Sequence, residues 1–353
     1  MPPNRVTVPE KALRALVSDL LIKYDLSRDH AETLTDVLVW ANLRGVDSHG
    51  VSRVPRYLEL FDNGEANPRP NLTVDVLRPA IAIVDADAAP GPVALTRAMD
   101  EAVSMARSTG AAWVAVRGTV HTGAIGYYTE RAAQYGMAGL GIVAGVPNMA
   151  YPGSNTAAVA TSPLSVAVPA DRHPTVTLDM ATAVIALGRI AQLKAQGKPL
   201  PDGAAVTKDG RPTTDPAEAA IPLPVGGAKG AGMSLLFEML AGGLTANPIV
   251  PAYHSGTEEG RRHRQNALLM AIDIAAFTPV EQFRRTVDET VDAIKSLPRT
   301  DPDAEILAPG ERGARTLDER TATGIPLPAK LLASLTQAAV DRGVTIPEEF
   351  PTP

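Results

Sequence analysis

Two histidines in this chain have neighbours that suit proton transfer. His49 lies in the segment Arg44-Gly45-Val46-Asp47-Ser48-His49-Gly50, and His121 lies in Val120-His121-Thr122-Gly123. Histidine is the commonest general acid or base because its unperturbed pKa is the nearest to neutrality. We therefore interpret both segments as candidate catalytic segments of an enzyme. On the residues alone, a structural role is an equally good interpretation for both histidines; in the first segment Arg44 would pair with Asp47 and Ser48-His49 would close a turn.

The residues that follow His49 suit the binding of a small carboxylate. Ser52 can cap a helix that carries a proline in its first turn, which places His49 just before a helix N-terminus, where anions are favoured. Arg53 and Tyr57 are four residues apart, so they share a face of that helix. A guanidinium binds a carboxylate through two parallel hydrogen bonds. The group therefore predicts a clamp for a carboxylate substrate.

Asp179 and the segment Gly226 to Gly232 are further candidates. Asp179 stands where a predicted strand ends and a predicted helix begins, so its carboxylate either caps that helix or orients a histidine. The glycines of Gly226 to Gly232 would let backbone amides approach a phosphate at a helix start, while Lys229 adds positive charge. A flexible interdomain loop is the alternative. The glycines from Gly139 to Gly145 suit a buried strand better than a nucleotide-binding loop.

Composition excludes several kinds of site. The chain has no cysteine, which excludes disulfides, thiolate catalysis and zinc sites built on sulfur, and no two histidines have the spacing of a metal site. No Gly-x-Ser-x-Gly elbow is present, so a serine hydrolase is disfavoured. We expect no metal. The remaining histidines stand in polar or turn-like contexts and are assigned solvated or structural roles: His30, His173, His254 and His263.

The charge balance argues against nucleic acid and membrane partners. The formal net charge is −6, so we interpret the basic cluster Arg261 to Arg264 as a surface or small-anion feature. No apolar run approaches the ~18 residues that a membrane span needs, and the N-terminus does not resemble a secretory signal. We expect a soluble, cytoplasmic protein.

Apolar periodicity predicts helices at both chain ends and an α/β or α+β core between them. A first helix follows a capping box at Thr7 to Glu10, a second runs from about Asp29 to Gly45, and a last one covers Pro326 to Leu335. Buried strands are assigned to Ala80–Val84, Ala111–Val116, Gly139–Ala144, Leu164–Val168, Val176–Leu178 and Leu268–Ile274. Further helices are assigned to Ala94–Ser108, Ala124–Tyr135, Thr182–Ala195, Met233–Leu244 and Glu281–Ile294.

The length of 353 residues exceeds the size at which one core usually keeps growing, so we predict two domains. Residues 1–75 and 300–353 form a helical domain built from both chain ends, in which the last helix packs on the N-terminal pair. Residues 76–299 form an α/β domain. Segments rich in proline, glycine and charge are assigned to surface connections: Asn67–Asn71, Gly197–Pro216 and Asp301–Gly313.

Several of these motifs, taken in order, resemble those of the malate/L-lactate dehydrogenase-like oxidoreductases. The resemblance covers nearly the whole chain. It rests on Arg44–Gly50 with Arg53 and Tyr57, His121–Tyr128, Leu178–Thr182, Arg211–Pro216 and Gly226–Gly232. The small Thr122 followed by Gly123, Ala124 and Ile125 is most similar to the ureidoglycolate dehydrogenase branch.

The resemblance implies a fold that binds NAD or NADP without a Rossmann domain. It implies a homodimer with an active site in a cleft between domains. Members exchange hydride between the nicotinamide and a 2-oxo acid or 2-hydroxy acid, such as malate, lactate or ureidoglycolate. Others reduce cyclic imino acids.

The resemblance also implies roles for individual residues. His49 and His121 become the proton-transfer candidates, with either one open as the working group, and Asp179 becomes a catalytic residue that partners a histidine. The substrate is held by Ser48, Arg53 and Tyr57. The cofactor is held by His121, Thr161, Asp179, Met180, Ala181, Lys229, Gly230, Pro309, Gly310 and Glu311. The choice between NAD and NADP stays open, since no family motif for it is found, although three basic residues could meet a 2′-phosphate: Arg189, Lys194 and Lys198.

Two segments differ from the family's usual pattern. The chain has Ala160-Thr161-Ser162-Pro163 where Gly-Thr-Asn-Pro is usual, and Tyr151-Pro152-Gly153-Ser154 where Pro-Trp-Gly-Gly is usual. Both fall where the resemblance places the nicotinamide pocket. They motivate a second hypothesis, in which the chain is a non-catalytic binding protein on this fold. A third hypothesis is that the chain is an imine reductase.

Overall fold

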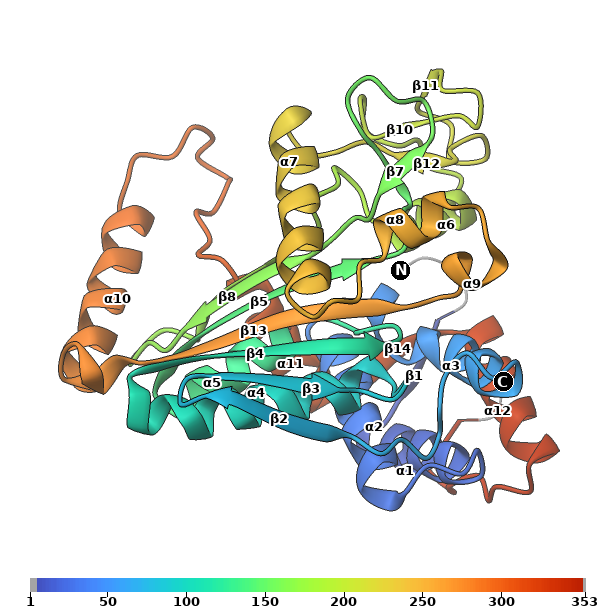
Figure 1. Cartoon of the computed structure of the whole chain (residues 1–353), viewed down its shortest axis with the longest axis horizontal. Helices are drawn as coiled ribbons and strands as arrows, with labels where there is room; N and C mark the ends of the chain where they lie inside the picture. The colour runs from blue at the N-terminus through green and yellow to red at the C-terminus, as the bar shows by residue number, and fades with distance from the viewer. Residues whose placement is uncertain (1–4, 352–353) are drawn as a thin grey trace.

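The structure is a computed structural model and describes residues 5–351. In this part of the chain the largest sheet has seven strands in the order β2-β3-β4-β13-β5-β8-β9, of which only β3 and β4 run parallel (Figure 1). Its strands are β2 (Thr73–Arg78), β3 (Ile81–Asp85), β4 (Ala111–Thr119), β5 (Met137–Gly145), β8 (Leu164–Val168), β9 (Val176–Met180) and β13 (Gln265–Asp273). Each predicted strand is found, but β9 is an exposed edge strand and not a buried one, and the exposed edge strand β2 was not predicted.

Helices cover the two faces of this sheet unequally. One face packs on α4 (Gly91–Thr109) and α5 (Gly126–Gln134), which share a core with the central strands. The other face is partly covered by α7 (Ala228–Phe237) and the π-helix that continues it, Glu238–Gly243. Figure 1 shows α7 above the sheet and α4 below it, with α10 (Val280–Lys295) at one end. The predicted α/β core is therefore confirmed.

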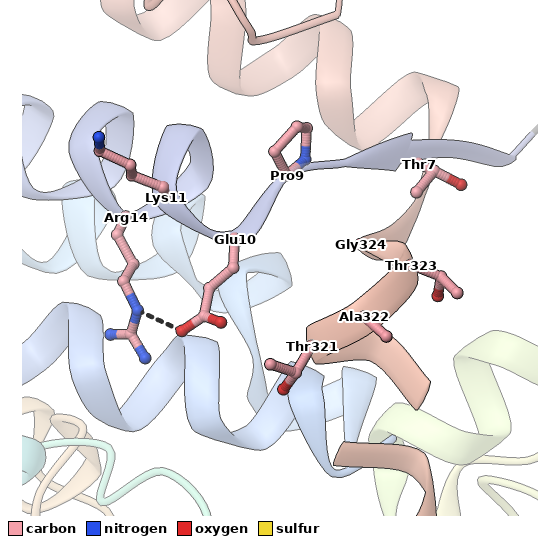
Figure 2. Close-up of a pocket in the computed structure, with 9 residues that line it drawn as sticks. All are labelled: Thr7, Pro9, Glu10, Lys11, Arg14, Thr321, Ala322, Thr323 and Gly324. Atoms are coloured by element: carbon pink, nitrogen blue, oxygen red, sulfur yellow. Dashed lines mark hydrogen bonds and ion pairs between the residues drawn. The ribbon is translucent and has the colours of Figure 1, made fainter. Parts of the chain in front are cut away.

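A second core unites the two ends of the chain. Strand β1 (Arg5–Val8) pairs antiparallel with β14 (Ile325–Pro328). Four helices share the core: α1 (Glu10–Ile22), α2 (Arg28–Leu43), α3 (Val54–Asp62) and α12 (Ala329–Asp341). Figure 2 shows where the ends meet, with Thr7 and Glu10 beside Thr323 and Gly324. The last helix thus lies against the N-terminal helices, and the domain boundaries at residues 75 and 300 stay a prediction.

The pairing of β1 with β14 corrects two expectations. Thr7 does not belong to a capping box, because it lies in β1 and Pro9 precedes α1 without a side-chain cap. The last helix starts at Ala329 and not at Pro326, because residues 325–328 form β14. Each error has the same cause, since a strand pair made by residues far apart in sequence leaves no local periodicity.

Two further helix boundaries differ from prediction. Helix α6 spans Leu187–Gln196, and Ala183 in the predicted helical stretch instead forms a bridge with Pro224. Helix α7 begins at Ala228, inside the glycine-rich segment, and not at Met233. The remaining helices are α8 (Val250–His254), α9 (Glu258–Arg261) and α11 (Glu311–Thr323). The predicted connection Gly197–Pro216 contains two short strands, β10 (Ala205–Val206) and β11 (Pro212–Thr213), which join β12 (Ile221–Pro222).

Candidate active site

His49 lies in a tight turn between α2 and α3, which we call the histidine turn (residues 47–53). Helix α2 ends at Leu43, and Gly45 reverses the chain with a φ of +77°, a conformation that favours glycine. Two 3₁₀ turns follow, η1 (Asp47–His49) and η2 (Val51–Arg53). The prediction that Ser52 caps α3 is wrong, because the Ser52 Oγ donates a hydrogen bond to the Asp47 carbonyl oxygen at 2.7 Å.

Residues from distant elements fasten the histidine turn. The Asp47 carboxylate accepts hydrogen bonds from Arg320 Nη1 of α11 at 2.6 Å and from Asn42 Nδ2 at 2.8 Å. The buried Asn42 also accepts the Val51 N–H through Oδ1 at 2.8 Å. The predicted alternative, an Arg44–Asp47 pair, is wrong, because Arg44 pairs with Glu130 of α5 at 2.9 Å.

His121 follows β4 and is held from three sides. Its carbonyl oxygen accepts hydrogen bonds from Gly91 N at 3.1 Å and from Tyr57 Oη at 2.7 Å. Next to it, Thr122 N donates to Gln265 Oε1 at 2.8 Å. A Cβ on Gly91 would lie 2.4 Å from the Thr122 Cα, so only glycine fits there. Tyr57 is 1% exposed, so its hydroxyl positions His121 and is not free to meet a ligand.

The protonation of His121 follows from its contacts. Gly123 N lies 3.3 Å from Nδ1 of His121, and Tyr57 Oη lies 3.1 Å from the same atom. A backbone N–H can only donate, so Nδ1 accepts and the ring proton of the neutral form lies on Nε2. The imidazole therefore has a fixed orientation, and within residues 5–351 no protein group bonds its Nε2.

The two predicted histidines lie side by side. Their rings stack with centroids 5.7 Å apart and planes 25° apart, and Ser48 Oγ lies 3.0 Å from Nδ1 of His49. Both rings are partly accessible to solvent although protein surrounds them, as expected of side chains that line a recess. Burial, reinforced by Arg53, lowers the pKa of His49 to about 4 and that of His121 well below its ordinary value. Both are neutral at pH 7.

Arg53 borders the same recess. Its Nε donates to the Ser48 carbonyl oxygen at 2.6 Å, and within residues 5–351 no carboxylate forms an ion pair with it. Burial lowers the pKa of Arg53, although the guanidinium stays charged. A Cβ on Gly188, at the start of α6, would lie 2.9 Å from Ser48 Cβ and 3.2 Å from Arg53 Nη2. A half-buried guanidinium without an acidic partner in the described residues thus lies between the histidine turn and the start of α6.

Asp179 lies on β9 and caps a different helix from the one expected. Its Oδ2 accepts the Gly126 N–H at 2.8 Å, at the first residue of α5, whereas α6 begins only at Leu187. In the described residues no hydrogen bond joins Asp179 to His49 or His121. More than a third of the residue is accessible to solvent, and burial of its carboxyl raises the pKa to about 6.

One set of predicted cofactor residues meets beyond the end of β9. Thr182 N donates to the Thr161 carbonyl oxygen at 3.1 Å, and Val225 N donates to the Thr182 carbonyl oxygen at 2.8 Å. Gly230 packs so closely on Thr182 that a Cβ would lie 2.4 Å from its carbonyl oxygen. Thr161, Ala181 and the glycine-rich segment are therefore adjacent.

The glycine-rich segment uses most of its backbone amides internally. The N–H groups of Gly227, Lys229, Gly230 and Ala231 all donate to carbonyl oxygens of residues 224–227. The side chain of Lys229 is exposed, and a Cβ on Gly227 would meet nothing within 4 Å. The Lys229 ammonium and the α7 dipole, rather than a cradle of amides, therefore offer charge to an anion.

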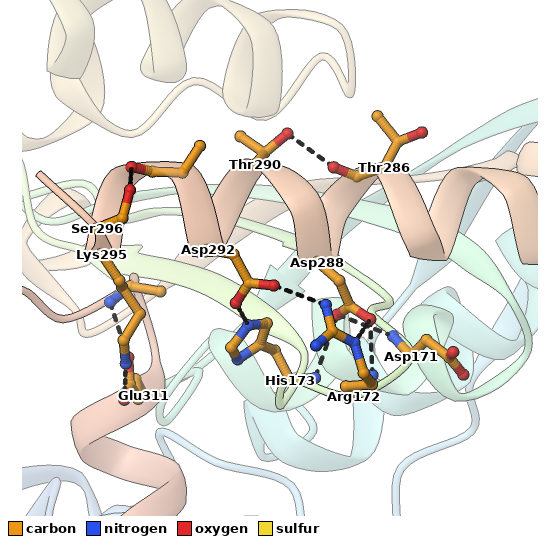
Figure 3. A network of polar contacts seen from close by, with 12 residues as sticks. Asp171, Arg172, His173, Thr286, Asp288, Thr290, Asp292, Lys295, Ser296 and Glu311 are labelled. Carbon is orange, nitrogen blue, oxygen red and sulfur yellow. Dashed lines mark hydrogen bonds and ion pairs between the residues drawn. The ribbon is translucent and has the colours of Figure 1, made fainter.

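A second set of predicted cofactor residues, Pro309 to Glu311, lies at the other end of β9. Thr177 N donates to the Pro309 carbonyl oxygen at 3.1 Å, and Arg44 Nη2 donates to the Gly310 carbonyl oxygen at 3.2 Å. The Glu311 carboxylate is bound within the protein, because its Oε1 accepts a hydrogen bond from Lys295 at 2.5 Å (Figure 3) and one from Arg315 at 2.5 Å. Burial alone would raise the pKa of Glu311, but these partners lower it to about 2. The predicted cofactor residues thus lie along about 13 Å of strand β9.

Sequence reasoning missed most residues that hold the site. Asn42, Arg320 and Gln265 gave no local signal, because each acts on a residue far away in sequence. Gly91 offered one, since Gly-Pro at a helix start is a typical boundary. Within residues 5–351, no cluster of three or more His, Cys, Asp or Glu side chains is arranged to hold a metal ion. No helix of this range has the length and apolar character that a membrane crossing requires.

Comparison with known proteins identifies the family. The family model described as malate/L-lactate dehydrogenase matches residues 8–336. The chain belongs to the malate/L-lactate dehydrogenase family. It is 34% identical over 352 residues to a malate dehydrogenase of Pyrococcus horikoshii, with 97% of each chain covered. It is 32% identical over 307 residues to a ureidoglycolate dehydrogenase (NAD(+)) of Escherichia coli K12, covering 86% of this chain and 87% of that protein.

Other members of the malate/L-lactate dehydrogenase family widen the range of cofactors and substrates. A (2R)-3-sulfolactate dehydrogenase (NADP(+)) of Chromohalobacter salexigens is 33% identical over 257 residues, covering 71% of this chain and 76% of that protein. The chain is therefore an NAD(P)-dependent dehydrogenase, as predicted. The identities to malate, sulfolactate and ureidoglycolate enzymes differ by too little to assign a branch.

Solved structures confirm the predicted fold. The sulfolactate dehydrogenase from Methanocaldococcus jannaschii superposes with a TM-score of 0.85 at 34% identity, covering 97% of this chain and 98% of that one. A delta1-piperideine-2-carboxylate reductase from Pseudomonas syringae superposes with a TM-score of 0.83 at 26% identity, covering 95% and 100%. The arrangement of the seven-stranded sheet is thus that of this dehydrogenase family.

Proposed function

We propose that this dehydrogenase interconverts a 2-hydroxy acid and the matching 2-oxo acid in the recess formed by His49, His121 and Arg53. The observation that carries the proposal is the Arg53 guanidinium, which is half-buried and has no carboxylate partner within residues 5–351. An unpaired cation in such a place is costly unless a ligand supplies the opposite charge. A substrate carboxylate supplies it, and the fork of the guanidinium fixes the orientation of the acid.

His121 transfers the proton in this proposal. Its ring is held by Tyr57 and Gly123, whereas in the described residues the ring of His49 has a single hydrogen-bond contact, to Ser48 Oγ. In the oxidising direction the neutral imidazole accepts the proton of the substrate hydroxyl. In the reducing direction a protonated His121 donates it, and the bound carboxylate favours that form because it offsets the positive charge of Arg53. His49 binds the substrate from the facing side.

Asp179 acts as a positioning residue. Its carboxylate caps α5, and the segment between His121 and that cap forms one wall of the recess. The predicted role as direct partner of a histidine is thereby replaced by a role that holds the backbone beside His121. The Ser48 carbonyl oxygen accepts a hydrogen bond from Arg53 Nε, and the Ser48 hydroxyl contacts His49 Nδ1.

The residues along β9 fit a nicotinamide cofactor. The exposed Lys229 has open space beside it at the start of α7, as a phosphate would need. We propose that Thr161, Met180, Ala181, Lys229 and Gly230 hold one part of NAD or NADP, and that Pro309 and Gly310 hold another. Bound NAD or NADP supplies the hydride acceptor or donor. Glu311 supports the second part through its backbone, because its carboxylate binds Lys295 and Arg315.

The activity test uses the purified protein with both cofactors. NADH and then NADPH are titrated while nicotinamide fluorescence is followed, and oxaloacetate, pyruvate and sulfopyruvate are then added while absorbance is recorded. We expect binding of one cofactor and its oxidation by at least one acid. Binding without turnover of any acid would favour a non-catalytic binding protein, and no binding of either cofactor would contradict the cofactor residues named above.

Imine reduction is the second candidate, favoured by the structural similarity to a piperideine-2-carboxylate reductase. The same recess would take a cyclic imino acid, with its carboxylate on Arg53 and its nitrogen beside His121. Adding delta1-piperideine-2-carboxylate to the same assay separates the two, since a preferred imine would give a cyclic amino acid and not a hydroxy acid.

The exposed face of the large sheet supports a homodimer. Side chains of six neighbouring strands form one row in register: Ile81, Trp113, Met270, Leu140, Val166 and Leu178. Ile81, Trp113 and Leu178 are each more than a third exposed. Beside this row, on the same face, the helix from Ala228 to Gly243 and the residue after it expose Leu236, Met239, Leu240 and Leu244. Apolar surface of this extent marks a protein interface.

We propose that a second copy of the chain covers this face. Light scattering after gel filtration should give twice the chain mass of 36.9 kDa. Leu240→Arg should yield the single-chain mass. The control is Val340→Arg, which changes an exposed apolar residue of α12 far from this sheet face and should leave the dimer intact. A cytoplasmic location is part of the same proposal, because the enzyme must draw on NADH or NADPH; cell fractionation tests it.

A further inference from the structure

A small lobe of the chain is packed separately from the two large cores. Residues 184–223, which we call the α6 lobe, contain α6, β10, β11 and β12, and Figure 1 shows these three strands together, outside the large sheet. The family motif Arg211–Pro216 forms turns inside the lobe, where Asp215 Oδ1 accepts the Ala217 N–H at 2.8 Å. The lobe has a core of its own, made by Ile185, Ile190, Leu193, Leu200, Ala204 and Ala205.

The lobe is joined to the rest of the chain by a narrow neck, residues 182–183 and 224–225, where Ala183 and Pro224 form a bridge. Within residues 5–351, no hydrogen bond or ion pair joins the α6 lobe to any residue outside it. The neck continues into Gly226 and Gly227, whose φ angles of +59° and +62° favour glycine. Changes in a few backbone torsions at such a connection can move a packed unit as one body.

The surroundings of the lobe leave room for such a movement. It rests on the hairpin of β6 (Met149–Ala150) and β7 (Ala157–Val159) through packing contacts, since a Cβ on Gly210 would lie 2.9 Å from the Asn155 Cβ. A cavity of about 550 Å³ lies beside the neck and is lined in part by Val184. Dense packing normally resists displacement inside a protein, and this space removes part of that resistance at the neck.

The first turn of α6 reaches two of the proposed substrate residues. A Cβ on Gly188 would lie 2.9 Å from the Ser48 Cβ and 3.2 Å from Arg53 Nη2, so α6 can approach this closely only with glycine there. The preceding residue, Leu187, is 43% exposed. The lobe therefore touches the histidine turn, and an apolar side chain next to the contact is still open to solvent.

We propose that the α6 lobe is a movable cover of the substrate site that turns about the neck. In the position seen in the structure, α6 lies against Ser48 and Arg53, and when the lobe swings away an acid can reach the guanidinium. Closure over the bound acid covers Leu187 and removes water, which strengthens the ion pair of the carboxylate with Arg53. The inference rests on the proposed function and adds a closing step to it.

Because the chain has no cysteine, two spin labels can report this movement. Glu59→Cys on α3 and Ala195→Cys on α6 change exposed residues, and pulsed electron paramagnetic resonance gives the distances between the labels. Without ligands we expect a broad distribution that includes distances longer than in the closed form. The reduced cofactor with malate, a pair that cannot react because both are reduced, should leave one narrow, shorter peak.

A matched pair of labels tests whether the lobe moves by itself. Glu59→Cys with Ser104→Cys, at an exposed residue of α4, reports on the two large cores without the lobe. This pair should give the same narrow distribution with and without ligands. A change in it would show that whole domains move, which contradicts a separate cover.

Leu187 provides a kinetic test of closure. Leu187→Ser should lower kcat/KM for the acid about 10-fold, because closing no longer buries an apolar side chain. Cofactor affinity, measured by nicotinamide fluorescence, should stay at the wild-type value. Val340→Ser, at an exposed residue of α12, is the control and should change neither quantity. A normal kcat/KM in Leu187→Ser would overturn the inference.

The remaining outcomes separate this inference from the proposed function. The same narrow distance between α3 and α6 in all samples would show that α6 is a fixed wall. If such a protein still oxidises the cofactor with an acid, only the cover is contradicted. If neither cofactor binds, the proposed function is contradicted, and the ligand-free distribution still decides whether the lobe moves.

Discussion

The histidine turn and the anchor of α10 are both rich in charged groups, but they differ in how those groups are partnered. In the anchor, Asp288 of α10 accepts the backbone N–H groups of Asp171, Arg172 and His173 at 2.9 to 3.3 Å. Asp292, one turn later, pairs with Arg172 at 2.6 Å and with His173 at 2.7 Å (Figure 3). In the histidine turn, Asp47 is also partnered, by Asn42 and Arg320, but Arg53 has no acidic partner within residues 5–351.

The difference separates structural charge from charge that awaits a ligand. Burial alone would raise the pKa of Asp288, but its three N–H partners and Arg172 outweigh burial and lower it. The pKa values of His49, His121 and Arg53 move in the direction that disfavours charge. Charged forms in the anchor thus stabilise the fold, whereas in the recess they become favourable only when a substrate supplies the opposite charge.

The largest effect is expected from His121. His121→Ala should lower kcat about 10²- to 10⁴-fold, because proton transfer to or from the substrate is lost. Stopped-flow and steady-state rates with the preferred acid measure it. His173→Ala, which removes a histidine of the anchor, should leave kcat unchanged. Normal turnover in both His121→Ala and His49→Ala would remove the histidine pair from the mechanism.

Arg53 comes next. Arg53→Ala should raise KM for the acid about 100-fold with NAD(P)H binding unchanged, because the bidentate contact to the carboxylate is lost. Arg53→Lys should recover only part of this, since an ammonium cannot form the fork. Kinetics over a range of acid concentrations, with cofactor affinity measured by fluorescence, distinguish the two. A KM that stays constant would show that Arg53 only holds the Ser48 carbonyl.

A smaller effect, on stability alone, is expected in the anchor. Asp288→Ala leaves three backbone N–H groups without their acceptor at a buried position. The free energy of unfolding should fall by about 1–3 kcal/mol, measured by urea denaturation. The kcat of the folded fraction should stay at the wild-type value, and a change in kcat would show that the anchor acts on the site.

The smallest effect concerns Asp179. Its pKa is about 6 in the folded chain and 3.8 as the unfolded reference, so between these values the folded state keeps a proton that the unfolded state has lost. The free energy of unfolding therefore falls as pH rises through this window. Asp179→Asn removes this dependence and should stabilise the chain by up to about 1 kcal/mol at pH 8, a value reduced for solvent screening. Denaturation at pH 4 and pH 8 measures it, and equal effects at both would be inconsistent with a raised pKa.

Local periodicity predicted the parts of the fold that local forces govern. The strands and helices of the central sheet have continuous apolar runs or a helical stripe, and each was found at its predicted place to within a few residues. Errors arose where one segment pairs with a distant one, as β1 does with β14 and Ala183 with Pro224. Edge strand β2 has mostly exposed side chains and so lacked an apolar signal.

The sequence by itself determined which residues can do chemistry. It singled out His49, His121 and Arg53 from their types and neighbours, and the order of motifs determined the family. Only the tertiary structure decided how they act together, because the stacking of the histidines depends on contacts between α3, β4 and β13. Tyr57 became a support of His121, and Asp179 became the cap of α5. Such roles depend on which polar atoms remain without partners after folding, and no local pattern in the chain records that.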